Sequence, residues 1–235
     1  DGNECVTEVL RWGTMSLSSL NRFLTGCTNL TTLPTIPASF DTSGVTNMDS
    51  AWNNCSGLTG QFPSGLDTSN VTSLFSAWQG CSGLTSFPSI DISNVTNMNF
   101  AWHSCSGLTS FPSGLDTSNV TDMTLTWYQC SGLTSFPFID TSNVTNMGYA
   151  WLQCTSLTEF PSIDVSANTD FNRTWGNCLA LSTFNPFINT TYTSAKWVDT
   201  WKNSDALAFT SVENSPFANI GLNTIPVFDI ASAVA

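Results

Sequence analysis

The sequence predicts a repeat solenoid, in which the chain winds through coils of 24–28 residues that stack along one axis. Three observations predict it: a six-fold Trp-x-x-Cys motif, a nearly constant spacing between cysteines, and apolar residues that recur at the same places in each interval. One such unit cannot bury its apolar row alone and must lay it against the next unit. The motifs are Trp52/Cys55, Trp78/Cys81, Trp102/Cys105, Trp127/Cys130, Trp151/Cys154 and Trp175/Cys178, and the spacings from Cys27 onward are 28, 26, 24, 25, 24 and 24 residues.

The repeat divides the chain into three regions. We expect residues 1–26 to form an N-terminal cap with a degenerate coil, residues 27–207 to form the solenoid, and residues 208–235 to form a C-terminal cap or contact segment. The pattern decays after Cys178, since Ser204 stands where the next thiol is due. Irregular ends are expected because the terminal units of a stack must present a polar face or a plug.

Three short elements are predicted in each unit. Between Met and Cys, apolar residues fall at i, i+3, i+4 and i+7, as in Met98, Ala101, Trp102 and Cys105. This spacing predicts a short helical segment of about two turns. The Leu-Thr-Ser-Phe-Pro stretch is short and ends in proline, so it predicts an extended strand. The Asp-Thr-Ser-Asn stretch is typical of turns, because Asp and Asn side chains bond backbone N–H groups two residues on.

Acidic residues dominate the charge of the chain. There are 17 Asp and Glu against 5 Lys and Arg, giving a formal net charge of −12, and only 9% of residues are charged. This excess of negative charge disfavours binding to the phosphate backbone of a nucleic acid, so no nucleic-acid partner is expected. No run reaches about 18 consecutive apolar residues, so no membrane insertion is expected either. A surface of Ser, Thr, Asn and Gly favours an extracellular, cell-surface or virion-surface location.

The phrase Asp-Thr-Ser-Asn-Val-Thr-x-Met recurs at Asp67–Leu74, Asp116–Met123 and Asp140–Met147. With the Cys-x-x-Leu grid it resembles the BspA-like leucine-rich-repeat family and, more closely, the related Mycoplasma-type surface-protein repeat. The resemblance covers roughly residues 15–207, with Trp in place of the family's Phe and Ala in place of the preceding Met. It implies a leucine-rich-repeat-like extracellular solenoid used for adhesion, host contact or phage and viral surface structures, with no catalytic activity.

The Trp and Cys columns are assigned to the core. The Trp residues lie on the same stripe as Met and Cys, which favours burial over a ladder for stacking sugar rings. The Cys residues are interpreted as buried, reduced thiols that act as small apolar fillers. Disulfides between adjacent coils stay open as an alternative, as does a Cys5–Cys27 bridge at the cap. No Cys/His cluster has the ligand spacing of a zinc site.

Two polar columns are assigned to turns. The Asp column is expected to accept backbone N–H groups, and calcium held between coils by Asp67, Asp91, Asp116 and Asp140 is the alternative. The recurrent Asn-x-Thr sites are interpreted as a side-chain amide ladder rather than as glycosylation acceptors. The columns comprise Asp41, Asp67, Asp91, Asp116, Asp140 and Asp164, and Asn70, Asn94, Asn119 and Asn143.

No catalytic constellation is present in the sequence. His103 is the only histidine, and no nucleophile-elbow or Gly-rich phosphate loop occurs. The acids occupy repeated positions rather than forming an unrepeated pair. We therefore expect a non-enzymatic protein with no cofactor.

One set of positions varies from coil to coil while the core positions repeat. Structure alone would be satisfied by the same polar residue in every coil, so this variable face is the candidate binding surface. The competing interpretation is that these side chains tuck between coils or vary neutrally. The set is Phe75, Gln79, Phe100, His103, Leu125, Tyr128, Tyr149, Leu152 and Arg173.

These observations favour a surface-displayed recognition or adhesion module on a virion fibre or a microbial cell exterior. Its expected partner is a host or cell-surface protein or glycan, bound through one face of the solenoid. The alternative is an architectural subunit or decoration protein of a phage tail, capsid or extracellular filament. In that case its exposed faces contact copies of itself, and the apolar residues 208–235 are the expected place of contact.

Overall fold

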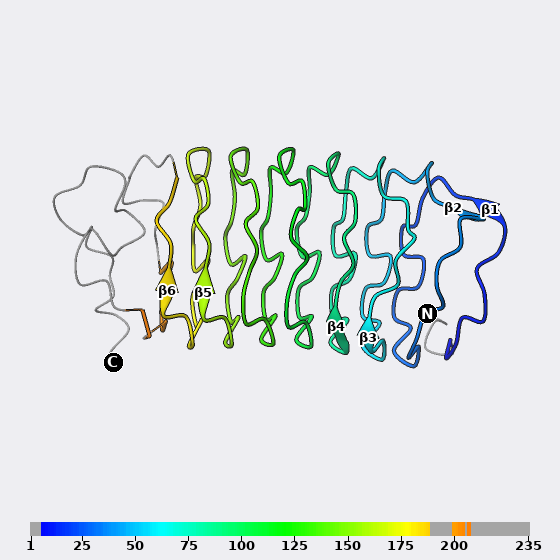
Figure 1. The fold of residues 1–235 in the computed structure, drawn as a ribbon, viewed down its shortest axis with the longest axis horizontal. Coiled ribbons are helices and arrows are strands. Elements are labelled where there is room, and N and C mark those ends of the chain that lie inside the picture. The colour runs from blue at the N-terminus through cyan, green and yellow to red at the C-terminus, as the bar shows by residue number, and fades with distance from the viewer. Residues whose placement is uncertain (1–5, 189–198, 205, 208–235) are drawn as a thin grey trace.

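The computed structural model describes residues 6–188, 199–204, 206 and 207, and Figure 1 shows them as a row of coils lying side by side. Six short strands occur in this part of the chain. They are β1 (Met15–Ser16), β2 (Phe40–Asp41), β3 (Gly60–Gln61), β4 (Leu84–Ser86), β5 (Glu159–Phe160) and β6 (Thr183–Phe184). Each strand pairs with the strand of the adjacent coil, so the six strands form three parallel two-stranded sheets, β1–β2, β3–β4 and β5–β6.

Parallel bridges outside the strands connect the coils in register. Asn47 pairs with Ser73, and the column continues through Asn97, Asp122 and further coils. A second line of backbone bonds joins the predicted extended segments, as where the Thr134 N–H donates to the Thr109 carbonyl at 3.1 Å. Equivalent residues of successive repeats are therefore direct neighbours in space.

The helical segment predicted from the apolar spacing between Met and Cys is wrong. No helix occurs in the residues that the structure describes, and this segment is a chain of tight turns. Every second N–H closes a turn, as Ala101 does onto the Met98 carbonyl at 3.0 Å. The N–H groups between them donate to the next coil, as Trp102 does to Thr126 at 2.9 Å. Because half of the donors serve the neighbouring coil, the i→i−4 ladder of a helix cannot form.

The turns require a left-handed backbone at two positions in each segment. The first has φ between 49° and 62° at Arg22, Ser50, Ser76, Phe100, Leu125, Tyr149, Arg173 and Asp199. The second, just before the Cys position, has φ between 53° and 77° at Gly26, Asn54, Gly80, Ser104, Gln129, Gln153, Asn177 and Asn203. A side chain in this conformation is strained relative to glycine.

Two aromatic ladders fill the core. The indoles from Trp52 to Trp175 are fully buried and lie nearly parallel, with centroid distances between 5.0 and 5.9 Å. A column of Phe rings meets them almost at right angles, as where Phe111 lies 4.8 Å from Trp102 at 84°. Offset stacking along the axis and edge contacts across it are both arrangements that aromatic rings prefer.

Both ends of the ladder are covered by aromatic side chains. At the N-terminal end Trp12 packs on Phe40 at 4.9 Å and donates its indole N–H to the Pro34 carbonyl at 2.9 Å. At the other end Trp201 stacks on Trp175 at 5.8 Å and 13°. The predicted contact segment 208–235 and Cys5 lie outside the described residues.

Candidate functional site

Variable positions of three successive coils gather into one aromatic cluster. Phe75 lies 5.7 Å from Phe100, Phe100 lies 5.6 Å from His103, and His103 lies 4.7 Å from Tyr128, measured between ring centroids. We call these four residues the aromatic cluster. Phe75 is 39% exposed, and the other three rings are half-buried. The cluster is therefore a continuous aromatic surface across neighbouring coils, not a set of separate side chains.

Leu152 does not belong to the exposed face, which corrects the sequence interpretation. Its side chain is only 8% exposed. A Cβ built on Gly176 in the next coil would lie 2.9 Å from the Leu152 Cδ1 atom. Leu152 therefore occupies the space beside Gly176, where a larger residue would place its side chain. For Leu152 the competing interpretation, that such side chains tuck between coils, is the correct one.

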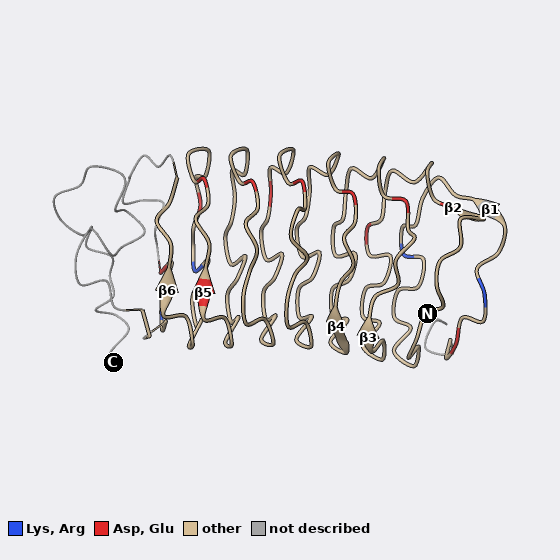
Figure 2. Cartoon of the chain, viewed as in Figure 1, with Lys and Arg blue, Asp and Glu red and all other residues tan. Residues whose placement is uncertain are grey.

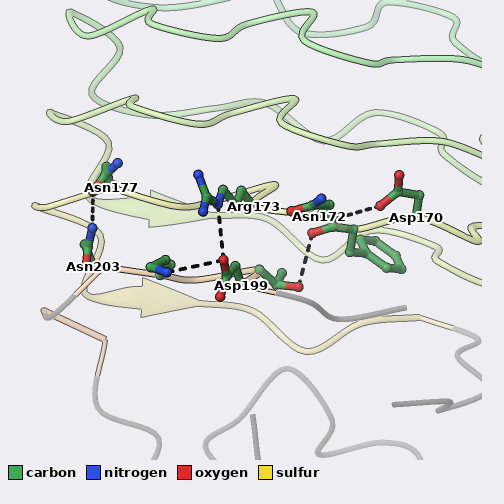
Figure 3. A network of polar contacts seen from close by, with 9 residues as sticks. Asp170, Asn172, Arg173, Asn177, Asp199 and Asn203 are labelled. Atoms are coloured by element: carbon green, nitrogen blue, oxygen red, sulfur yellow. Dashed lines mark hydrogen bonds and ion pairs between the residues drawn. The ribbon is translucent and has the colours of Figure 1, made fainter. Parts of the chain in front are cut away.

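The remaining members of the variable set are of two kinds: half-buried residues with large side chains, and one arginine in an ion pair. Leu125 and Tyr149 are half-buried and follow Phe100 in the first left-handed position. Arg173, at the same position, is engaged: its Nε lies 3.2 Å from Asp199 Oδ2, which also lies 3.4 Å from Lys202 Nζ. Figure 3 shows this network at the C-terminal end of the described coils, next to the bond from Asn203 to Asn177.

A groove with a volume of about 610 Å³, lined mostly by residues with polar side chains, runs along the coils beside the Cys column. We call it the amide groove. Its lining residues are Ser82, Ser104, Ser106, Gln129, Ser131, Gln153, Thr155, Asn177 and Leu179. They come from the second left-handed position and from the position after each cysteine. The sequence interpretation missed this groove, although a run of Ser, Gln, Gln and Asn before successive cysteines was its signal.

Hydrogen bonds order the groove wall and connect it to the aromatic cluster. Ser104 donates from Oγ to Gln129 Oε1 at 3.0 Å, and Gln129 donates from Nε2 to Gln153 Oε1 at 2.8 Å. Ser104 Oγ also lies 2.9 Å from His103 Nδ1. Burial lowers the pKa of His103, so its imidazole is neutral at pH 7. Gln79, another polar member of the variable set, lies outside this network and accepts a bond from Asn53 Nδ2 at 3.1 Å.

Charge around the site is one-sided. No Lys or Arg lies between Arg22 and Arg173 in the sequence. Figure 2 shows acidic residues recurring along one edge of the stack, with basic residues only toward its ends. None of the residues that line the amide groove is charged. An anionic ligand would therefore meet no cation in the groove.

The Asp column caps its own turns. Asp67 Oδ1, for example, accepts from the Ser69 N–H at 3.0 Å and from its hydroxyl at 2.7 Å. Hydrogen bonds from the serine two residues on lower the pKa of Asp41, Asp91 and Asp116. No group of three or more His, Cys, Asp or Glu residues that could hold a metal ion occurs in the described part of the chain. The calcium alternative for Asp67, Asp91, Asp116 and Asp140 thus gains no ligand set there.

The Asn column forms bonds between coils. Asn94 Nδ2 donates to the Ser69 carbonyl and Asn119 Nδ2 to the Ser93 carbonyl, both at 2.7 Å. Asn70 and Asn143 donate in the same way at 2.9 and 2.7 Å. The amide groups that a glycosyltransferase would modify are therefore already used to join neighbouring turns.

The cysteines form a column of free thiols. None of the seven cysteines from Cys27 to Cys178 is in a disulfide, so the bridges between adjacent coils left open by the sequence are not formed there. Each thiol from Cys81 to Cys178 lies 3.0–3.2 Å from the carbonyl of a Trp in the preceding coil. Burial raises the pKa of Cys105 and Cys178 to about 12. At the end of the column Ser204 replaces the thiol and donates to Trp175 at 2.7 Å.

The fold and the site together define a class: a protein of stacked repeats whose core positions recur in each coil and whose outward positions carry an aromatic cluster beside an uncharged groove. The chain belongs to the family described as "Mycoplasma protein of unknown function, DUF285", which matches residues 3–135 and again residues 85–185. No curated protein and no solved structure matches the chain. Within the described ranges there is no helix with the length and apolar character that a membrane crossing needs.

Proposed function

We propose that this chain is a non-enzymatic recognition module that acts outside the cell and binds a cell-surface partner through the aromatic cluster together with Leu125 and Tyr149, which lie in the same and the next coil as Tyr128. The fold class that best suits this role is a leucine-rich-repeat-like solenoid, in which a repetitive core leaves a long outer surface free for contact. Adhesion is the activity that the proposal assigns to the site, on either a microbial cell exterior or a virion fibre.

The observation that carries the proposal is the presence of bulky side chains where the backbone is left-handed. Phe100, Leu125 and Tyr149 have φ of 59°, 57° and 62°. Holding a bulky side chain there costs about 1 kcal/mol relative to a residue that tolerates the conformation. Ser50 and Ser76 occupy the same position in earlier coils, so the fold itself does not need an aromatic or aliphatic group.

The rings of the cluster are not needed to fill the core. All six indoles of the core are fully buried, whereas the cluster rings are half-buried or, like Phe75, exposed. Bulky groups that remain partly exposed at a position where the fold accepts serine are typical of binding surfaces. Aromatic side chains are also the residues that contribute most binding energy at protein interfaces.

Binding of the fluorescently labelled protein to intact microbial and animal cells tests the proposal. Replacing Phe100 and Tyr128 with Ser should weaken cell binding at least about tenfold, because two central contacts are lost. Phe138→Ser is the matched control, since Phe138 is an aromatic ring 60% exposed that lies outside the cluster. Equal binding by the double variant, or self-association of the free protein into filaments in place of cell binding, would overturn the proposal.

A further inference from the structure

We infer that the amide groove binds a neutral, linear oligosaccharide. This inference rests on the proposed function and names the ligand class: the cell-surface partner is recognised through its uncharged glycan. The groove lies next to the aromatic cluster, since Ser104 of the groove wall contacts His103 and Gln129 directly follows Tyr128 in the chain. One ligand can therefore occupy the groove and contact the cluster together.

The chemistry of the groove wall matches hydroxyl groups. A glutamine amide presents one acceptor oxygen and two donor hydrogens, and a serine hydroxyl can donate and accept. A sugar hydroxyl has the same double capacity. The hydroxyls of Ser82, Ser106 and Ser131 have no hydrogen-bond partner among the described residues, so they are available to a ligand.

The wall is ordered before a ligand arrives. The chain of bonds from Ser104 through Gln129 to Gln153 holds two amides in fixed orientations across three coils. Side chains that are already ordered lose less conformational entropy when they bind. A groove that served only solvation would not need this connection between coils.

The absence of charge selects the class of glycan. The lining residues carry no charge, and no Lys or Arg lies between Arg22 and Arg173. Sulfated, uronic or phosphorylated glycans would therefore lack a cation to pair with. An uncharged sugar needs no such partner.

The length of the groove selects a linear ligand. Its lining runs from Ser82, which follows Cys81, to Leu179, which follows Cys178, so it crosses five coils. At about 4.8 Å between neighbouring coils, four steps span about 19 Å. A single sugar ring would fill only part of this length. The aromatic pair of His103 and Tyr128 beside the groove offers ring faces against which the apolar C–H face of a pyranose packs.

Native gel electrophoresis through gels that contain a soluble neutral polysaccharide tests the inference. The probes are mannan, xylan and a mixed-linkage β-glucan, with heparin as the anionic comparison. We expect retardation by at least one neutral polysaccharide and none by heparin. Retardation should fall at least about tenfold in apparent affinity for Gln129→Ala combined with Gln153→Ala. Phe138→Ser should migrate as the unaltered protein does.

A second variant keeps the result interpretable. Ser106→Trp fills the groove without removing a bond of the wall, and Ser106 is an exposed residue. It should abolish retardation while thermal unfolding stays unchanged. No retardation by any neutral polysaccharide, retardation by heparin alone, or retardation that survives both groove variants would overturn the inference.

Treatment of the target cells separates this inference from the proposed function. Periodate oxidation of cell-surface sugars should abolish cell binding, whereas protease treatment should leave it. Binding that survives periodate and is lost after protease would overturn the glycan inference and leave the recognition function standing. Retardation in polysaccharide gels without any binding to cells would overturn the recognition function and leave the glycan inference standing.

Discussion

The indole of Trp102 lies 5.9 Å from that of Trp127, with an angle of 2° between the ring planes. The two residues are 25 positions apart in the sequence and occupy the same place in adjacent coils. Neither indole N–H has a hydrogen-bond partner among the described residues. The ladder thus stabilises the stack through buried area and ring contacts, with no hydrogen bond from the indole nitrogen.

The first prediction concerns Trp102. Trp102→Ala should lower the free energy of unfolding by about 3–5 kcal/mol, because it removes a fully buried ring and leaves a cavity. Trp102→Phe should cost markedly less, about 1–3 kcal/mol, because a ring still fills the column and no N–H bond is lost. Denaturation in urea measures both variants. Equal losses for Phe and Ala would contradict a ladder that works by ring packing.

The second prediction concerns the reactivity of the thiols. At pH 8 the native protein should leave the seven cysteines from Cys27 to Cys178 unreacted with a thiol reagent, because all seven side chains are fully buried and the reagent cannot reach them. All eight cysteines of the chain should react in urea if they are reduced. Rapid labelling of the column in the native protein would show that the core opens or that its thiols are not buried.

The third prediction is a loss of stability at alkaline pH. The pKa is raised to about 11 for Cys27 and to about 12 for Cys105 and Cys178, above the ordinary value of 9.0. The unfolded chain therefore releases these protons first, and stability should fall as pH rises from about 9 toward 12. Cys105→Ser should flatten this dependence, and Ser204 shows that a hydroxyl fits the column. A free energy of unfolding that is constant over this range would contradict the buried thiols.

The fourth prediction is a loss of stability at acidic pH. Hydrogen bonds from Ser43, Ser93 and Ser118 lower the pKa of Asp41, Asp91 and Asp116. A carboxyl group with a lowered pKa stabilises the fold above its unfolded value, so stability should be lost as pH falls below about 4. Ser118→Ala should weaken this dependence for one turn. The melting temperature of both proteins is measured as the pH is lowered. The same dependence on acidic pH in both would argue against the hydrogen bonds from serine to aspartate in the turns.

The fifth prediction concerns close approach of the coils at Gly107. A Cβ there would lie 2.5 Å from the Ser82 carbonyl oxygen and 2.7 Å from that of Leu84. Gly107→Ala should therefore destabilise the protein by about 1–3 kcal/mol, because backbone must move. Gly148→Ala is the matched control, since its nearest atoms are side-chain oxygens at 3.3 and 3.4 Å. Thermal unfolding measures both variants, and equal melting temperatures would contradict the close approach at Gly107.

The core could be read from the sequence because each core position repeats in every coil. The buried state of the indoles and thiols follows from one stripe that Met, Ala, Trp and Cys share. The local backbone could not be read from that stripe. A spacing of i, i+3, i+4 and i+7 fits both a helix and a chain of turns, and the choice depends on donors such as Trp102 N–H that serve the next coil.

The site was only partly predictable. Phe100, His103 and Tyr128 stood out because they vary while their neighbours repeat, and the structure brings their rings together. Leu152 varies in the same way but is buried, because its space is created by Gly176 one coil later. The groove was missed because Gln129 and Gln153 resemble ordinary surface polar residues until the stacking of coils places their amides in contact.

Hydroxyl-radical footprinting of the protein bound to intact cells tests most directly where recognition occurs. It measures the oxidation of individual side chains, and the cluster consists of reactive rings. The account predicts that oxidation of Phe100, His103 and Tyr128 falls on binding while that of Phe138 is unchanged. Unchanged oxidation of the cluster together with protection of Phe138 would contradict it.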